Sequence, residues 1–177
     1  KYIFITSGTA IGSVLALAEA ISDLRNCNVY VLCTDKKTSQ IIRSSKFVKN
    51  VVYINNKDEK GYITEVKGWY EQAKFKEKPV LYFTTDTSCF YINNHRKWFD
   101  SNFILCMPSS EIIKAFTQKG LAEKKAEQSG LIVPRTQVIQ NNKDINIVLS
   151  DFQFPVILKP RATYLKEGVN FKIKVIQ

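Results

Sequence analysis

The first part of the chain alternates short apolar runs with amphipathic segments. Residues 2–6 form a β-branched and aromatic run that stops at Ser7, and from Gly12 onward apolar residues recur at helical spacing. A second apolar run covers residues 29–33. A buried strand, a turn, an amphipathic helix and a second strand form the right-handed crossover unit of parallel sheets.

The same alternation continues to Pro108. It predicts further helices and strands in turn: a helix over 38–45, a strand over 48–54, a helix over 61–76, a strand over 80–83, a helix over 86–99 and a strand over 103–106. Such alternation indicates an α/β fold with a doubly wound, open parallel sheet, and we expect the strand order 3-2-1-4-5. This domain is predicted to span residues 1–108.

The pattern changes after Pro108, where residues 109–177 form a second unit. The sequence predicts a capped helix to about residue 119, a helical stretch that stops at Gly130, a helix over 144–151, and strands over 155–160 and 171–176. So few short strands and helices cannot close a core by themselves, because small units bury too little of their surface. We therefore expect an incomplete α+β unit, truncated before it closes.

The charge favours an anionic partner but not nucleic acid. The chain has 26 Lys and Arg against 16 Asp and Glu, a formal net charge of +10. The basic residues are scattered, with no basic arm or recognition helix, so a lysine-rich surface explains the charge better than nucleic-acid binding. No apolar run approaches the roughly 20 residues of a membrane span, and no membrane association is expected. Four cysteines without a CxxC pair indicate a cytoplasmic protein with reduced thiols.

Two turns are predicted to meet at the carboxyl edge of the sheet. Gly8 to Gly12 follows the first strand and opens a helix, and Thr85-Asp86 follows the fourth strand. Strands one and four are neighbours in the expected order, so Ser7, Gly8, Gly12, Thr85 and Asp86 should line one crevice, where backbone N–H groups can hold a phosphate or carboxylate. Alternatively, the glycines only permit a tight turn and Thr85 or Asp86 only caps the next helix. The turn lacks the dinucleotide motif.

The remaining reactive side chains do not form a catalytic set in the sequence. His95 is the only histidine and lies in a polar stretch with no cysteine beside it, so we interpret it as a surface residue. The cysteines lie mostly in or near predicted strands, where they act as small hydrophobic residues rather than nucleophiles. No metal site is predicted within this chain.

The second unit carries the most informative pattern. The pattern is K-x6-A-x3-G-x3-P-x-T, formed by Lys119, Ala126, Gly130, Pro134 and Thr136. The segment FPVILKP, which contains Lys159, follows it. This pattern resembles the start of an ATP-grasp domain, and the Thr85-Asp86 pair and the Met107-Pro108 strand end are similar to the carboxylate-amine ligase branch. In that superfamily a Rossmann-like pre-ATP-grasp domain precedes the ATP-grasp fold.

The resemblance implies a function. Lys119 and Lys159 match the lysines that reach the ATP phosphates from the smaller lobe. The implied reaction activates a small-molecule carboxylate as an acyl phosphate, which a small-molecule amine attacks. The Mg²⁺ ligands and adenine contacts are expected outside this chain, which should be inactive by itself. Relatives with this arrangement are often dimers, so a homodimer is one expectation.

The chain also departs from the family pattern. Gln118 replaces the usual Asp, and the stretch after Lys159 lacks the usual density of glycines. Arg161, Thr163 and Lys166 in that stretch either approach the phosphates or belong to a plain connecting hairpin. The alternative function is a non-catalytic, Rossmann-like module that binds a small anion or nucleotide. The residue that separates the two functions is Lys159, whose ammonium we expect to meet a ligand rather than bulk water.

Overall fold

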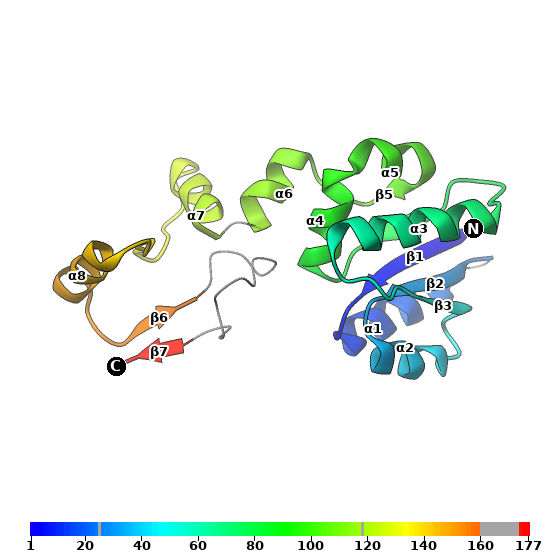
Figure 1. Ribbon diagram of the computed structural model, residues 1–177, viewed down its shortest axis with the longest axis horizontal. Coiled ribbons are helices and arrows are strands. Elements are labelled where there is room, and N and C mark those ends of the chain that lie inside the picture. Colours follow the sequence, from blue (N-terminus) through cyan, green and yellow to red (C-terminus); the bar gives the residue numbers. More distant parts are fainter. Residues whose placement is uncertain (25, 118, 160–173) are drawn as a thin grey trace. The chain divides into compact units, whose positions relative to one another are not determined.

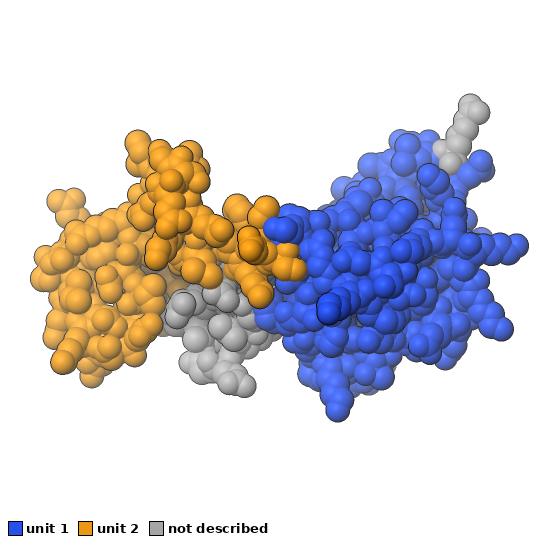
Figure 2. All heavy atoms as spheres, turned by 90° about the horizontal axis from the view of Figure 1, so that it is seen from above, with its two compact units in different colours: residues 1–109 blue, residues 110–177 orange. Residues whose placement is uncertain are grey.

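The computed structural model describes residues 1–24, 26–117, 119–159 and 174–177 (Figure 1). The chain divides into two compact units, Lys1–Ser109 and Ser110–Gln177 (Figure 2). None of the described helices is long and apolar enough to cross a membrane.

The first unit is built on a five-stranded, all-parallel sheet. Its strands are β1 (Tyr2–Ser7), β2 (Asn28–Cys33), β3 (Asn50–Tyr53), β4 (Val80–Tyr82) and β5 (Ile104–Leu105). Their order is β3-β2-β1-β4-β5, which confirms the predicted order. The central strand β1 pairs with β2 on one side and β4 on the other, so that Ser7 lies opposite Cys33 and Ile5 opposite Tyr82.

Helices cover both faces of this sheet (Figure 1). They are α1 (Ile11–Ser22), α2 (Lys36–Arg43), α3 (Glu59–Ala73), α4 (Asp86–Asn94) and α5 (Arg96–Asn102). The prediction of one helix over 86–99 is wrong. At His95 the backbone leaves the helical region, with φ −110° and ψ 24°, so α4 ends and α5 begins there.

Each face of the sheet has its own core. Because successive side chains of a strand point to opposite faces, Ile3 and Ile5 pack with α1 and α2 on one face, and Phe4 packs on the other. The Phe4 side is rich in aromatic rings: Trp69 of α3 and Tyr30 of β2 have ring centroids 5.0 and 5.1 Å from that of Phe4. The doubly wound α/β fold predicted from the sequence is confirmed.

The described residues of the second unit form three helices and a two-stranded antiparallel sheet. Its elements are α6 (Ser110–Thr117), α7 (Lys119–Gln128), α8 (Asn142–Asp151), β6 (Val156–Leu158) and β7 (Lys174–Ile176). The strands pair antiparallel, with Ile157 opposite Val175. After α7 the chain turns at Gly130, whose φ is +78°, as the sequence predicted. Arg161, Thr163 and Lys166 lie outside the described residues.

Candidate functional site

The carboxyl ends of β1 and β4 meet in the first unit, as the strand order predicted. A Cβ atom placed on Gly8 would lie 3.4 Å from Cγ2 of Thr85, so the two turns are in van der Waals contact. The Thr84 hydroxyl donates to the carbonyl oxygen of Thr6, and the amide of Thr84 donates to the Thr6 hydroxyl at 3.3 Å. Ser7, Gly8 and Thr85 therefore lie together at one edge of the sheet.

A buried hydroxyl group that the sequence analysis did not identify holds this edge together. Ser88, in the first turn of α4, donates to the Thr6 hydroxyl at 2.7 Å, and both side chains are buried. Thr85 Oγ1 lies 2.5 Å from the Ser88 oxygen. The feature of the sequence that could have indicated this bond is Thr6, a polar residue that directly follows the apolar residues 3–5 of β1. These bonds fix the start of α4 against the end of β1.

Thr85 and Asp86 have local roles at the start of α4. The Thr85 side chain accepts a hydrogen bond from the Ser88 amide at 3.2 Å and is the N-cap of the helix. Asp86 is the first residue of α4 and is exposed, so its negative charge lies near the positive end of the helix dipole. The capping alternative considered for Thr85 is thus confirmed, and capping leaves room for a further role in binding.

The start of α1, which follows β1, is exposed to solvent. Its N-cap residue Ala10 makes no side-chain capping bond. Gly12 is exposed, and a Cβ atom added to it would meet nothing within 4 Å. A larger residue would therefore fit at position 12. The first amides of α1 donate no capping bond to the side chain of the N-cap residue, Ala10, and a ligand could bind them instead.

The end of β2 contributes a thiol and a carboxylate to the same edge. Cys33 is buried, with its sulfur 3.3 Å from the Asp35 carbonyl oxygen and 3.8 Å from that of Gly8. Burial raises the pKa of this thiol, which keeps it protonated and unreactive. Asp35 caps α2 by accepting from the Thr38 amide at 2.8 Å, and this bond lowers the pKa of its carboxyl. Cys33 acts as a small buried residue, as expected.

The second unit places Lys159 against α7. Lys159 directly follows β6, and its ammonium donates to Oε1 of Glu123 at 3.2 Å. The side chains are 41% and 23% exposed, so Lys159 is an exposed residue whose ammonium pairs with the more buried Glu123 carboxylate. Lys119 is the first residue of α7, one helical turn before Glu123. The side chain of Lys119 lies outside the part of the chain that the structure describes.

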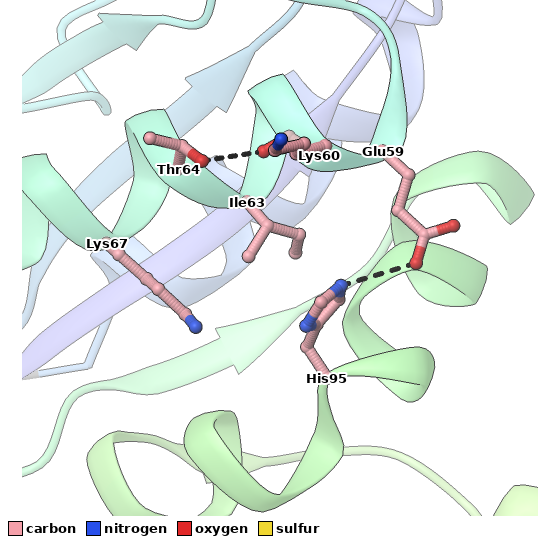
Figure 3. A pocket seen from close by; sticks show the side chains of 6 residues that line it. All are labelled: Glu59, Lys60, Ile63, Thr64, Lys67 and His95. Carbon is pink, nitrogen blue, oxygen red and sulfur yellow. Dashed lines mark hydrogen bonds and ion pairs between the residues drawn. The ribbon is translucent and has the colours of Figure 1, made fainter.

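A shallow pocket of about 310 Å³ lies in the first unit, away from all predicted site residues (Figure 3). Its lining residues come from α3 and the junction of α4 and α5: Glu59, Lys60, Ile63, Thr64, Lys67 and His95. Figure 3 shows the His95 imidazole turned toward the Glu59 carboxylate, with Nε2 3.3 Å from Oε1. The Lys67 ammonium lies 5.2 Å from the centroid of the Trp98 ring. These pairings tie α3 to α4 and α5.

No metal centre is evident among the described residues. Nowhere in residues 1–24, 26–117, 119–159 and 174–177 do three or more His, Cys, Asp or Glu side chains gather closely enough to hold an ion. The described residues thus do not fit a Mg²⁺ site.

Two solved structures share this architecture. The biotin carboxylase domain of the Hydrogenobacter thermophilus 2-oxoglutarate carboxylase matches with a TM-score of 0.61 and 10% identity, over 97% of this chain and 37% of that one. It was solved as a dimer with MgADP, ADP and bicarbonate. The biotin carboxylase domain of a single-chain bacterial carboxylase matches with a TM-score of 0.51 and 12% identity, over 83% of this chain and 34% of that one. This chain has the fold of part of a biotin carboxylase domain.

At 10% and 12% identity these matches show a likeness of fold, which agrees with the fold that the predicted resemblance implies. The chain spans about a third of the length of these two structures. No protein-family model matches the sequence, and no curated protein matches it either.

Proposed function

We propose that this chain is part of an ATP-dependent carboxylate-amine ligase, in which Lys159 and Lys119 bind the phosphates of ATP. Support comes from Lys159: in an ATP-grasp fold, its ammonium lies at the end of β6 and already contacts an anionic group, the Glu123 carboxylate. A lysine that follows an apolar strand and is accessible to solvent is placed to contact a charged ligand.

The chemistry of the proposed reaction suits lysine side chains. ATP supplies the phosphoryl group that activates a carboxylate as an acyl phosphate, and an amine then displaces phosphate. The ammonium groups of the two lysines contribute positive charge beside the phosphates, and their flexible side chains can follow the charge as it moves. The MgADP and bicarbonate in the Hydrogenobacter neighbour support a nucleotide, a metal and a small carboxylate-like anion as ligands of the whole protein.

The crevice of the first unit is the proposed substrate site. The uncapped amides at the start of α1, near Gly12, suit the carboxylate of a small molecule. Ser7, Gly8 and Thr85 would form its wall, and Asp86 would place a negative charge at its edge. The same uncapped amides also favour the alternative function, a non-catalytic module that binds a small anion without any role for Lys159.

The proposal also covers the cellular compartment, the oligomeric state and the substrates. None of the four cysteines forms a disulfide, and reduced thiols suit a reducing compartment such as the cytoplasm. The Hydrogenobacter neighbour was solved as a dimer, which supports a homodimer here. Small-molecule carboxylate and amine substrates remain the expected partners.

Calorimetric titration of MgATP into the full-length gene product tests the proposal. We expect Lys159→Ala to weaken binding by about tenfold or more, because a charge-assisted hydrogen bond contributes about 1.5–3 kcal/mol. Lys124→Ala removes the same charge from an exposed position on α7 and is the matched control, expected to bind within about twofold of wild type.

Equal affinity of the wild type and Lys159→Ala would contradict the ligase proposal. Binding of a small carboxylate such as succinate, with no binding of MgATP, would favour the anion-binding module instead.

A further inference from the structure

We infer that Glu123 is a placeholder for the nucleotide phosphates, holding the Lys159 ammonium until a sufficiently charged anion displaces it. The inference rests on the proposed function, because it assumes that Lys159 is the lysine that binds phosphate. It adds a residue that decides which anions can bind at this site.

The contact joins two elements that are distant in sequence. Glu123 lies in the middle of α7 and Lys159 follows β6, 36 residues later, yet Nζ and Oε1 are 3.2 Å apart. The glutamate is the more buried partner, with 23% of its side chain exposed against 41% for the lysine. The lysine side chain is therefore the more accessible of the two partners.

The strength of the contact suits a placeholder. A partly exposed ion pair stabilises a protein by about 0–1 kcal/mol, because solvent and salt screen both charges. A triphosphate carries several negative charges and presents several acceptor oxygens, whereas Glu123 presents one carboxylate. A polyanion can therefore take the ammonium from Glu123, and an anion with a single charge competes with it poorly.

The position of Glu123 on α7 adds a second effect. Residues 119 and 123 are four apart, so they lie one turn apart on the same side of the helix. An anion bound between positions 119 and 159 would lie close to the Glu123 carboxylate. Repulsion from that carboxylate lowers the affinity for every anion and excludes those that gain little from the lysines.

A purely structural role makes the opposite prediction. If the ion pair only fastened α7 to the end of β6, removing the Glu123 charge would loosen Lys159 and weaken nucleotide binding, or leave it unchanged. Tighter binding when the charge is removed is predicted both by a placeholder that competes with the ligand and by repulsion alone, and the Lys159→Ala background separates these two effects.

Calorimetric titration of MgATP and of inorganic phosphate into the full-length protein tests the inference. We expect Glu123→Gln to bind MgATP about three- to tenfold more tightly than wild type and to gain at least as much for inorganic phosphate. Glu127→Gln makes the same charge change one turn later on α7 and is the matched control, expected within about twofold of wild type. Glu123→Asp keeps the charge and is also expected within about twofold.

A double variant shows whether the effect acts through Lys159. Glu123→Gln should tighten binding by Lys159→Ala clearly less than it tightens binding by the wild type, because only the repulsion is removed and no ammonium is released. An equal gain in that background, or unchanged or weaker binding by Glu123→Gln alone, overturns the inference and leaves the proposed function intact. Equal binding by wild type and Lys159→Ala overturns both.

Discussion

Tyr62 shows how one residue is fitted into this core. It is 2% exposed, packs with its ring centroid 5.7 Å from that of Tyr91, and its hydroxyl has no hydrogen-bond partner among the described residues. Burial without a partner raises the pKa of the hydroxyl well above its ordinary value. The ring contributes to stability, whereas the hydroxyl oxygen costs free energy when it leaves water.

Tyr62→Phe should therefore be harmless at neutral pH and protective at alkaline pH. At pH 7 we expect the free energy of unfolding to stay within about 1 kcal/mol of wild type or to rise, because an unpaired buried hydroxyl is removed. Because the folded-state pKa is raised, the stability linked to Tyr62 is present below the unfolded pKa of about 10 and is lost above it. Near pH 10.5 the wild type should thus lose about 1 kcal/mol more than Tyr62→Phe.

Urea denaturation at the two pH values provides the measurement. A loss of more than about 2 kcal/mol at pH 7 would mean that the hydroxyl has a partner after all.

At the residue scale the site was predictable only in part. The meeting of Gly8 and Thr85 follows from strand order, which the sequence indicated. The Thr6 and Ser88 bond does not, because it depends on which way two side chains point across 82 residues of chain. The contact between Lys159 and Glu123 is of the same kind.

At the scale of elements, α3 contains two glycines in opposite situations. A Cβ atom on Gly61, in the first turn, would lie 2.4 Å from Cβ of Asn56. The amide of Asn56 donates to the Glu65 carboxylate at 3.0 Å, so the loop before α3 is tied to the helix and cannot move freely. A Cβ atom on Gly68, in the middle of the helix, would meet nothing within 4 Å.

Alanine at these two positions should have effects of opposite sign. Gly61→Ala is expected to lower the free energy of unfolding by about 1–3 kcal/mol, as overpacking against a fixed neighbour does. Gly68→Ala is expected to raise it by about 0.5–1 kcal/mol, because alanine is the better helix former. Chemical denaturation of the two variants measures both values, and a stabilising Gly61→Ala would show that the loop at Asn56 yields easily.

The boundaries of helices cannot be predicted from the helical spacing of apolar residues alone. The sequence predicted a single helix over 86–99, yet the structure divides this segment at His95 into α4 and α5. The break is stabilised by contacts with another element, since His95 pairs with Glu59 of α3. A periodicity within one segment carries no information about such a contact.

On the scale of the whole molecule, the two units differ in how much core they contain. Both clusters of buried apolar residues lie entirely within the first unit. Among the described residues of the second unit, only Ile113 and Ala115 are buried and apolar. Phe116 and Ile132 there are 75% and 102% exposed. A small hydrophobic core in the second unit was expected from the few short strands and helices that its sequence predicts.

The two units should therefore differ in independent folding. A fragment of residues 1–109 is expected to unfold cooperatively in urea, because it retains both clusters. A fragment of residues 110–177 is expected to show no cooperative transition, because it buries too little apolar surface to offset its chain entropy. Circular dichroism of the two fragments makes the comparison, and a cooperative transition in the second would contradict it.

The sequence by itself determined the type of most elements, because hydrophobic periodicity is a local property, and it predicted the strand order from the order common to doubly wound sheets. It also indicated an ATP-grasp resemblance, with which the observed fold agrees. Only the tertiary structure decided which polar side chains meet: Ser88 with Thr6, His95 with Glu59, and Lys159 with Glu123. Such pairs depend on the register of strands and the rotation of helices, which packing sets and no local pattern records.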